Sequence, residues 1–428
     1  MIVRNGKTTH LIGRDISYIM FENEDGDLLN FHFGKKIADI DYSQMKEEWE
    51  EKWGFVSNRF CLDNYPQEYP SYGYSDLKNP AYQVVNKFGN TVSRLAVKEY
   101  IIHNECTVQT DGMPCLFNKN KKADTLEVVL YDEIIDLEVH LYYTVFDEYN
   151  IIARHTVIIN KSDSNIKLLS AYSASIDLPM DDYEMIHFAG SWGRERAMHR
   201  TKLEMGMKAE VENARGGSGH QLNPFSMITS VGADETHGEV YGFLLVYSGN
   251  HSTVAKIDQF GNLRVQQGIN PHQFEWILKP NESFCTPQSI ISYSDSGIGT
   301  MTREYHDVFR NNLMRSKWVN KKRPILINNW EGTYFDFTEE KLLQMAETAH
   351  KAGVELFVLD DGWFGKRNND TCSLGDWKVN YDKLPSGIDG LAEKINKIGM
   401  KFGLWFEPEM ISPDSDLYRE HPDWAIHI

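Results

Sequence analysis

The chain has 428 residues, of which 41% are hydrophobic and 12% aromatic, so it is long and apolar enough to form two or more cored domains. Its formal net charge of −18 argues against nucleic acid or an anionic membrane as a partner, because such partners require clustered Lys and Arg. A neutral or cationic small substrate suits this charge better.

The N-terminus lacks the apolar run of a signal peptide, and no apolar segment is long enough to cross a membrane. We therefore expect a cytoplasmic protein. The five cysteines are an odd number without a CxxC pair, which predicts neither a disulfide framework nor a zinc site. We expect reduced and mostly buried thiols at Cys61, Cys106, Cys115, Cys285 and Cys372.

Residues 1 to about 300 alternate apolar and polar positions in short runs that Gly, Asn and Asp interrupt. Clear examples are residues 137–146, 151–159, 240–247 and 273–278. Many strands without intervening helices predict a large antiparallel β-sandwich.

Helical spacing follows at residues 301–313, and the basic, polar stretch 315–324 comes next. We place the domain junction there. The first predicted domain is 1–315, a β-sandwich with a helical linker at its end, and the second is 316–428.

Three apolar runs in the second domain, 324–327, 355–359 and 401–404, each become polar and aromatic at their C-terminal ends. Amphipathic helical segments separate them, as in the opening of a (β/α)8 barrel. A closed barrel has eight such units and about 250 residues, so we expect only the first three strand-helix units within this chain.

Active sites of such barrels lie where the strands end, which makes the indoles and carboxylates placed there candidate site residues. Asp360 and Asp361 would point to opposite faces of a regular strand, but both can reach a ligand where the chain turns. Trp330 and Trp405 end the neighbouring strands. The alternatives are an Asp pair that caps the following turn and indoles that pack in a core.

Two glutamates after the third barrel strand and one tryptophan in the sandwich are further candidates. Glu407 and Glu409 have the look of a catalytic carboxylate pair, but Pro408 favours an extended backbone, so we expect them to organise the third loop through hydrogen bonds. Trp192 lies in a charged loop, where burial at a domain interface is the alternative to a role in binding.

Several segments together resemble the α-galactosidases of glycoside hydrolase family 36. In the barrel these are PILINNW at 324–330, LFVLDDGWFG at 356–365 and GLWFEPEM at 403–410. In the sandwich they include residues 67–73, GSWGRER at 190–196, 220–225 and 258–261. The resemblance covers nearly the whole chain.

The resemblance implies an N-terminal β-supersandwich followed by a catalytic barrel that cleaves terminal α-galactosyl residues with retention of configuration. Asp360 and Asp361 would bind galactose hydroxyls, Trp330 and Trp405 would form walls of the sugar pocket, and Trp192 would close it. The family's nucleophile and acid/base aspartates are expected after Ile428, so no catalytic residue is assigned within this chain, and we expect the chain alone to be inactive. The resemblance also implies no metal or organic cofactor and a homotetramer at full length, with melibiose- or raffinose-type oligosaccharides as substrates.

Three alternatives remain open. A non-catalytic galactoside-binding protein would keep Asp360, Asp361, Trp330 and Trp405 without needing the later aspartates. An oligomerisation module would need none of them, and an α-N-acetylgalactosaminidase would differ in loops that follow. The unpaired edge of a three-stranded parallel sheet also predicts association through the C-terminal third.

Overall fold

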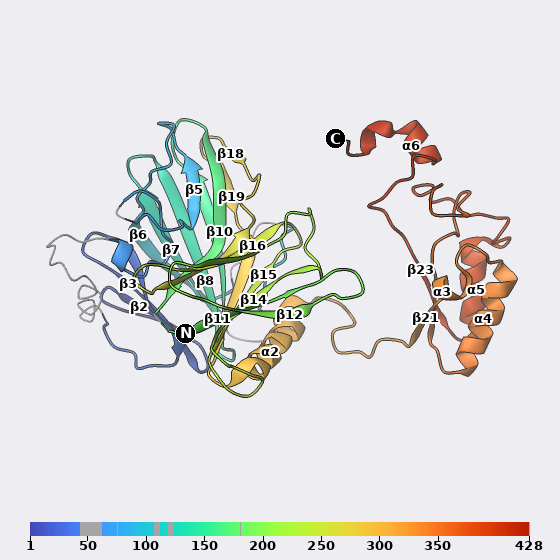
Figure 1. The fold of residues 1–428 in the computed structure, drawn as a ribbon, viewed down its shortest axis with the longest axis horizontal. Helices are drawn as coiled ribbons and strands as arrows, with labels where there is room; N and C mark the ends of the chain where they lie inside the picture. Colours follow the sequence, from blue (N-terminus) through green and yellow to red (C-terminus); the bar gives the residue numbers. More distant parts are fainter. Residues whose placement is uncertain (43–61, 75, 107–111, 119–122, 180, 428) are drawn as a thin grey trace. The chain divides into compact units, whose positions relative to one another are not determined.

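The structure is a computed structural model, and it describes residues 1–42, 62–74, 76–106, 112–118, 123–179 and 181–427. The chain divides into two compact units, Met1–Arg315 and Ser316–Ile428, and each is described here by itself (Figure 1). The division falls inside the basic stretch that precedes the first predicted barrel strand.

The first unit begins with an antiparallel sheet of four described strands in the order β1-β2-β3-β4. Its register places Thr8 opposite Phe21, and the side chains of β2 and β3 are almost all buried. The strands are β1 (Ile2–Asn5), β2 (Thr8–Ile12), β3 (Ile16–Glu22) and β4 (Leu28–Lys35).

A larger sheet runs in the order β12-β11-β14-β15-β20-β9-β8-β7-β6, and β19 also pairs with β9. The predicted strand 137–146 is present as β8, and the predicted strand 151–159 is present as β9 with one residue more. The members are β6 (Ala96–His103), β7 (Ala123–Asp132), β8 (Leu137–Phe146), β9 (Ile151–Asn160), β11 (Tyr183–Ala189), β12 (Ala197–Lys202), β14 (Leu222–Ser230), β15 (Val240–Val246), β19 (Ser283–Cys285) and β20 (Gln288–Ser294).

The third sheet of this unit runs β13-β16-β17-β10-β18, and β5 pairs with β10 outside that order. Apolar residues from all three sheets, including Leu126, Leu141, Ile176 and Val265, form one buried core. The predicted strand 273–278 is shorter than expected, because Gln273 has a φ of +57° and turns the chain. The members are β5 (Tyr82–Val85), β10 (Ile166–Leu178), β13 (Lys208–Glu212), β16 (His251–Ile257), β17 (Leu263–Ile269) and β18 (Trp276–Leu278).

Helix α2 (Gly297–Val308) and the π-helical turn η3 (Phe309–Leu313) end the first unit, as the helical spacing of 301–313 predicts. Met301, Tyr305 and Val308 recur on one face and are buried against the second core cluster. The antiparallel sheets of the first unit confirm the large antiparallel sandwich that we predicted.

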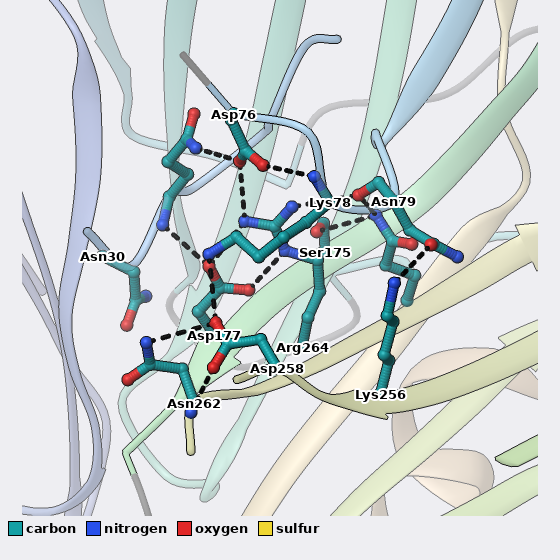
Figure 2. Close-up of polar contacts among 12 residues, drawn as sticks. Asn30, Asp76, Lys78, Asn79, Ser175, Asp177, Lys256, Asp258, Asn262 and Arg264 are labelled. Atoms are coloured by element: carbon teal, nitrogen blue, oxygen red, sulfur yellow. Dashed lines mark hydrogen bonds and ion pairs between the residues drawn. The ribbon is translucent and has the colours of Figure 1, made fainter. Parts of the chain in front are cut away.

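A buried polar network holds the segment that follows η2 (Leu62–Asn64) against β10 and β17 (Figure 2). The guanidinium of Arg264 donates to both oxygens of Asp177, at 2.7 and 2.8 Å, and to Asp76 Oδ2 at 3.2 Å. All three side chains are at most 4% exposed. Lys78 Nζ adds an ion pair to Asp258 at 3.4 Å, so two buried cations hold three buried aspartates in this network.

A second buried arginine lies in the core of the same unit. Arg154 pairs with Glu68 at 2.7 Å, and the hydroxyls of Tyr18 and Tyr143 donate to Glu68 Oε1 at 2.6 and 2.7 Å. Asn30 Nδ2 donates to the other carboxylate oxygen at 3.0 Å. Glu68 belongs to the same chain segment as Asp76, so this segment is fixed at two places.

The second unit contains a parallel sheet in the order β21-β22-β23, with Asn328 opposite Val358 and Leu359 opposite Leu404. The three predicted strands and their connecting helices are present, which confirms the expected partial barrel. The elements are β21 (Leu326–Asn328), α3 (Trp330–Thr333), α4 (Glu339–Lys351), β22 (Leu356–Leu359), α5 (Gly387–Ile398), β23 (Lys401–Leu404), α6 (Asp416–Glu420) and η4 (Pro422–Trp424).

Local sequence sets the ends of these helices. Thr338 Oγ1 accepts a hydrogen bond from the amide of Lys341 and caps the start of α4. Gly399 ends α5 in the left-handed region at a φ of +103°, which glycine adopts at little cost. Leu342, Ala346, Leu391 and Ile395 pack both helices onto the sheet.

Four cysteines fall within the described residues and all are free. Cys106 and Cys115 are buried, whereas Cys285 and Cys372 are half-buried. Cys61 lies outside the described residues. In the described part of the chain, every helix is too short or too polar to span a bilayer.

Candidate functional site

The C-terminal ends of β21, β22 and β23 meet at one edge of the sheet, because the strands are parallel and hydrogen-bonded in register. Trp330 follows the first strand, Asp360 and Asp361 follow the second, and Trp405 follows the third. The four barrel residues singled out in the sequence are thus brought to the same edge. Trp192 belongs to the first unit.

Two asparagines join the first loop to the second. Asn329 is fully buried, and its Oδ1 accepts the amide of Asp360 at 2.7 Å while its Nδ2 donates to Thr333 Oγ1 at 2.8 Å. Asn328 Nδ2 donates to Asp360 Oδ2, and Asn328 Oδ1 accepts the amide of Trp330 at 2.7 Å. These bonds fix Asp360 relative to Trp330.

The two adjacent aspartates have different surroundings. Asp361 is 6% exposed, and Arg367 donates to its two oxygens from Nε at 2.9 Å and from Nη2 at 2.7 Å. Asp360 is half-buried and receives one side-chain donor, from Asn328. A carboxylate has about four acceptor positions, so Asp360 keeps the larger capacity to accept hydroxyl groups.

Lys383 connects the loops around Asp361. Its Nζ donates to the carbonyl oxygens of Phe335 at 2.9 Å, Gly362 at 3.1 Å and Arg367 at 3.1 Å. Burial lowers the pKa of the Lys383 ammonium, partly offset by the charge of Asp361. Neither Arg367 nor Lys383 was identified from the sequence, although a basic residue beside a buried Asp is the partner such a charge requires.

The two indoles are half-buried at the same edge. Trp330 contacts Tyr334 and Phe335 edge to face, with ring centroids 5.1 and 5.0 Å away. Trp405 continues the sheet, since its amide donates to Leu359 O at 2.9 Å and its carbonyl accepts from Trp363 Nε1 at 3.0 Å. Aromatic faces held beside carboxylates suit a ligand with both apolar C–H and hydroxyl groups.

Glu407 and Glu409 do not organise the third loop as predicted. Among the residues that the structure describes, neither carboxylate makes a hydrogen bond, and the loop contact is the amide of Met410 with Glu407 O at 3.4 Å. Burial raises the pKa of Glu407, and the nearby charges of Glu409 and Asp361 raise it further. Among the described residues, the expectation that these two glutamates organise the third loop through hydrogen bonds is therefore wrong.

Trp192 lies at the tip of the hairpin that β11 and β12 form in the first unit, and it is 86% exposed within that unit. The tip is held by Gly190, whose amide donates to Gln221 O at 2.9 Å, and by Arg196, whose amide donates to His220 O at 3.2 Å. A Cβ at position 190 would lie 1.8 Å from the carbonyl oxygen of Arg194, so only glycine fits there. The turn that carries the exposed indole of Trp192 is therefore held by backbone hydrogen bonds and requires glycine at position 190.

No three His, Cys, Asp or Glu side chains gather as the ligands of a metal ion would, within the described ranges of the chain. The polar groups at the strand ends instead are carboxylates, amides and indoles, which together suit a polyhydroxylated ligand.

Three strand-helix units with acidic and aromatic residues at their strand ends, in a chain that also contains a large β-sandwich, suit the class of barrel proteins that act on carbohydrates. Comparison with known families defines the class further. The glycosyl hydrolase family 36 N-terminal domain matches residues 26–279, and the melibiase family matches residues 283–428. The chain belongs to glycosyl hydrolase family 36.

Individual relatives agree along the whole chain. The alpha-galactosidase AgaA of Geobacillus stearothermophilus is 46% identical over 427 residues, and Mel36A of Lactobacillus acidophilus is 40% identical over 430 residues. Both alignments cover 99% of this chain and 58% of the relative, so the chain spans less than two thirds of their length. The crystal structure of the alpha-galactosidase AgaB from G. stearothermophilus matches with a TM-score of 0.94 at 46% identity, covering 100% of this chain and 59% of that one.

Proposed function

We propose that the protein of which this chain forms part is an α-galactosidase. It would remove terminal α-D-galactosyl residues from oligosaccharides of the melibiose and raffinose type. The observation that carries this proposal is the pair Asp360 and Asp361, held between Trp330 and Trp405 at the strand ends of a family 36 chain. Crystal structures of AgaA variants in complex with raffinose and with stachyose support the choice of substrate class.

In this proposal the strand-end residues bind the sugar. The acceptor positions of Asp360 that Asn328 and the amide of Asp361 leave free accept galactose hydroxyls, and those of Asp361 that Arg367 and the amide of Gly362 leave free do the same. Trp330 and Trp405 contact the C–H side of the ring. Trp192, at the tip of its hairpin, is proposed to close the sugar pocket.

Cleavage itself is assigned to aspartates that follow Ile428 in the complete protein, and no residue of this chain is proposed as catalytic. One carboxylate attacks the anomeric carbon to form a glycosyl-enzyme while the other protonates the leaving oxygen. The second carboxylate then activates a water molecule that releases galactose with retained configuration. We propose a homotetramer at full length and no metal in this reaction.

The test is hydrolysis of an aryl α-galactoside by the 428-residue chain beside a version extended through a complete barrel. Activity of the long version alone supports the assignment. Turnover by the short chain would contradict it and would make Glu407 and Glu409 the first residues to examine. Unchanged galactose binding after Asp361→Ala would contradict the binding role of the strand-end residues.

A further inference from the structure

Asp361 and Arg367 form a buried ion pair at the strand ends, in which the guanidinium donates to both oxygens of the carboxylate. Arg367 is 3% exposed and donates from Nε to both oxygens of Asp361, at 2.9 and 3.1 Å, and from Nη2 to Oδ2 at 2.7 Å. Its Nη1 donates to the carbonyl of Cys372 at 2.9 Å, which fixes the guanidinium plane. The rotation of the Asp361 carboxylate is therefore set by Arg367 and not by solvent.

The backbone that carries this pair is fixed by Lys383. Its three carbonyl partners come from the first loop, at Phe335, and from the second loop, at Gly362 and Arg367. Its ammonium also lies 4.8 Å from the ring centroid of Phe337. One cation thus sets the spacing between the loop that carries Trp330 and the loop that carries both aspartates.

The two adjacent aspartates therefore differ in the charges that surround them. Asp361 is neutralised by Arg367, whereas no cation is bonded to Asp360 among the described residues, where its carboxylate receives the neutral side-chain amide of Asn328 and the backbone amide of Asp361. An orientation fixed before the ligand arrives lowers the cost of binding, because less conformational freedom is then lost. The two cations supply this fixed orientation from outside the sugar-binding surface.

We infer that Arg367 and Lys383 are positioning residues that preset the Asp361 carboxylate and the spacing of the first two loops for recognition of galactose hydroxyls. This inference rests on the proposed function. Neither cation is free to contact the sugar directly with the groups described, since the donors of Arg367 and of Lys383 are directed at Asp361 and at backbone carbonyls. Their effect on the ligand passes through Asp361 and through the loops.

The test uses the protein at its full natural length, with Arg367→Met and Arg367→Lys compared for hydrolysis of an aryl α-galactoside. Arg367→Met removes the cation from the buried carboxyl of Asp361, which keeps the amide of Gly362 as a donor, and the loss of the cation favours the protonated form. We expect KM to rise about 10²-fold with kcat changed by less than about threefold, because Asp361 binds the sugar equally in ground and transition states. The acid limb of the pH profile of kcat/KM moves to higher pH.

Arg367→Lys keeps the charge but loses the two-pronged donor geometry. We expect it to restore the acid limb and only part of the KM. The matched control is Arg419→Met, because Arg419 is an exposed arginine of the same unit that pairs with Asp414 and Asp416. It should leave KM and the pH profile unchanged.

Folding is checked for each variant by circular dichroism and thermal unfolding. Wild-type KM and an unmoved acid limb in folded Arg367→Met or Arg367→Lys would overturn the inference. If both arginine variants fail to fold, Lys383→Met decides, with a raised KM expected and an unchanged KM contradicting it. Absence of galactosidase activity in the wild-type protein would instead reject the proposed function, so the two failures are distinguishable.

Discussion

Buried arginines hold aspartates in both units, Arg264 in the first and Arg367 in the second. In the first unit Arg264 joins Asp177 to Asp76, which lies in the segment before β5, and all three side chains are buried (Figure 2). In the second unit Arg367 holds Asp361 in a similar two-pronged way, but the next residue, Asp360, remains half-buried with acceptor positions open.

The difference separates a structural network from a candidate binding site. Around Arg264 the acceptors are met by protein donors, including the amide of Gln67 at 3.0 Å from Asp177. At the strand ends Arg367 holds Asp361, whereas Asp360 receives the amide groups of Asn328 and Asp361 and is bonded to no cation among the described residues. Buried charge alone therefore does not indicate function, and the candidate site differs from the structural network by the half-buried carboxylate of Asp360.

The largest effect should come from removing the cation of the structural network. Arg264→Met leaves Asp177 and Asp76 buried without their partner, so we expect a loss of about 3–5 kcal/mol in unfolding free energy. Denaturant titration measures it. Arg310→Met, at an exposed pair with Asp307, is the control and should cost less than about 0.5 kcal/mol. A loss below about 1 kcal/mol for Arg264→Met would contradict a structural role for the Arg264 network.

The next effect concerns binding and not stability. Asp360→Asn keeps the shape but removes the charge that strengthens hydrogen bonds to hydroxyls, by about 1.5–3 kcal/mol, which is about 10- to 100-fold in galactose affinity. Calorimetry on the full-length protein measures the affinity. Unfolding free energy should barely change, because Asp360 is half-buried. The reverse pattern is expected for Asp177→Asn, which should destabilise without changing affinity, and equal affinity in Asp360→Asn would contradict the comparison.

Glu138 on β8 is a carboxylate of the first unit, and its removal should have a smaller effect than the two changes above. It pairs with Lys98 at 2.8 Å and with His140 at 3.0 Å. Burial alone would raise the pKa of Glu138, but Lys98 and His140 outweigh it and lower the pKa from 4.5 to about 2. A lowered folded pKa means that the stabilisation is present above pH 4.5 and is lost as the pH falls toward 2.

Glu138→Gln should therefore remove about 1–2 kcal/mol of stability at pH 6 and almost none near pH 2. Unfolding free energies of the wild type and the variant, measured across this range, give the difference directly. A difference that stays constant with pH would show that packing and not ionisation sets the contribution of Glu138.

The smallest effect is expected at Glu407. Its pKa is raised by burial and by the charges of Glu409 and Asp361, so its ionised form costs stability at neutral pH. Glu407→Gln should raise the unfolding free energy by less than about 1 kcal/mol at pH 7, and the gain should vanish on acidification, where the wild-type carboxyl is also neutral. Melting temperatures at pH 7 and pH 4 measure it, and a gain at both pH values would contradict the electrostatic cause.

Much of this fold follows from local pattern. The strands β8 and β9 alternate clearly, and the three barrel strands end at polar and aromatic residues that mark the edge of the sheet. These features depend on neighbours in sequence, so the sequence was sufficient to predict them. The β18 strand was predicted too long because a positive φ at Gln273 has no signature in hydrophobic alternation.

The partners at the candidate site were harder to predict. Asp360, Asp361, Trp330 and Trp405 stand at strand ends and could be named, but Arg367 and Lys383 lie in the long loop that separates β22 from α5. Which carbonyl or carboxylate a loop cation meets depends on tertiary structure, and the same limitation explains the wrong expectation for Glu407 and Glu409. A basic residue six positions after Asp361 was the available signal.

The hairpin tip at Gly190 has an optical consequence. Because the glycine holds the turn and leaves the indole of Trp192 86% exposed within its unit, this side chain should fluoresce at long wavelength and be quenched readily by dissolved acrylamide. Anything that covers the tip would shift the emission toward the blue and shield it from quencher. Trp192 is thus a built-in reporter of whatever comes to lie against the hairpin.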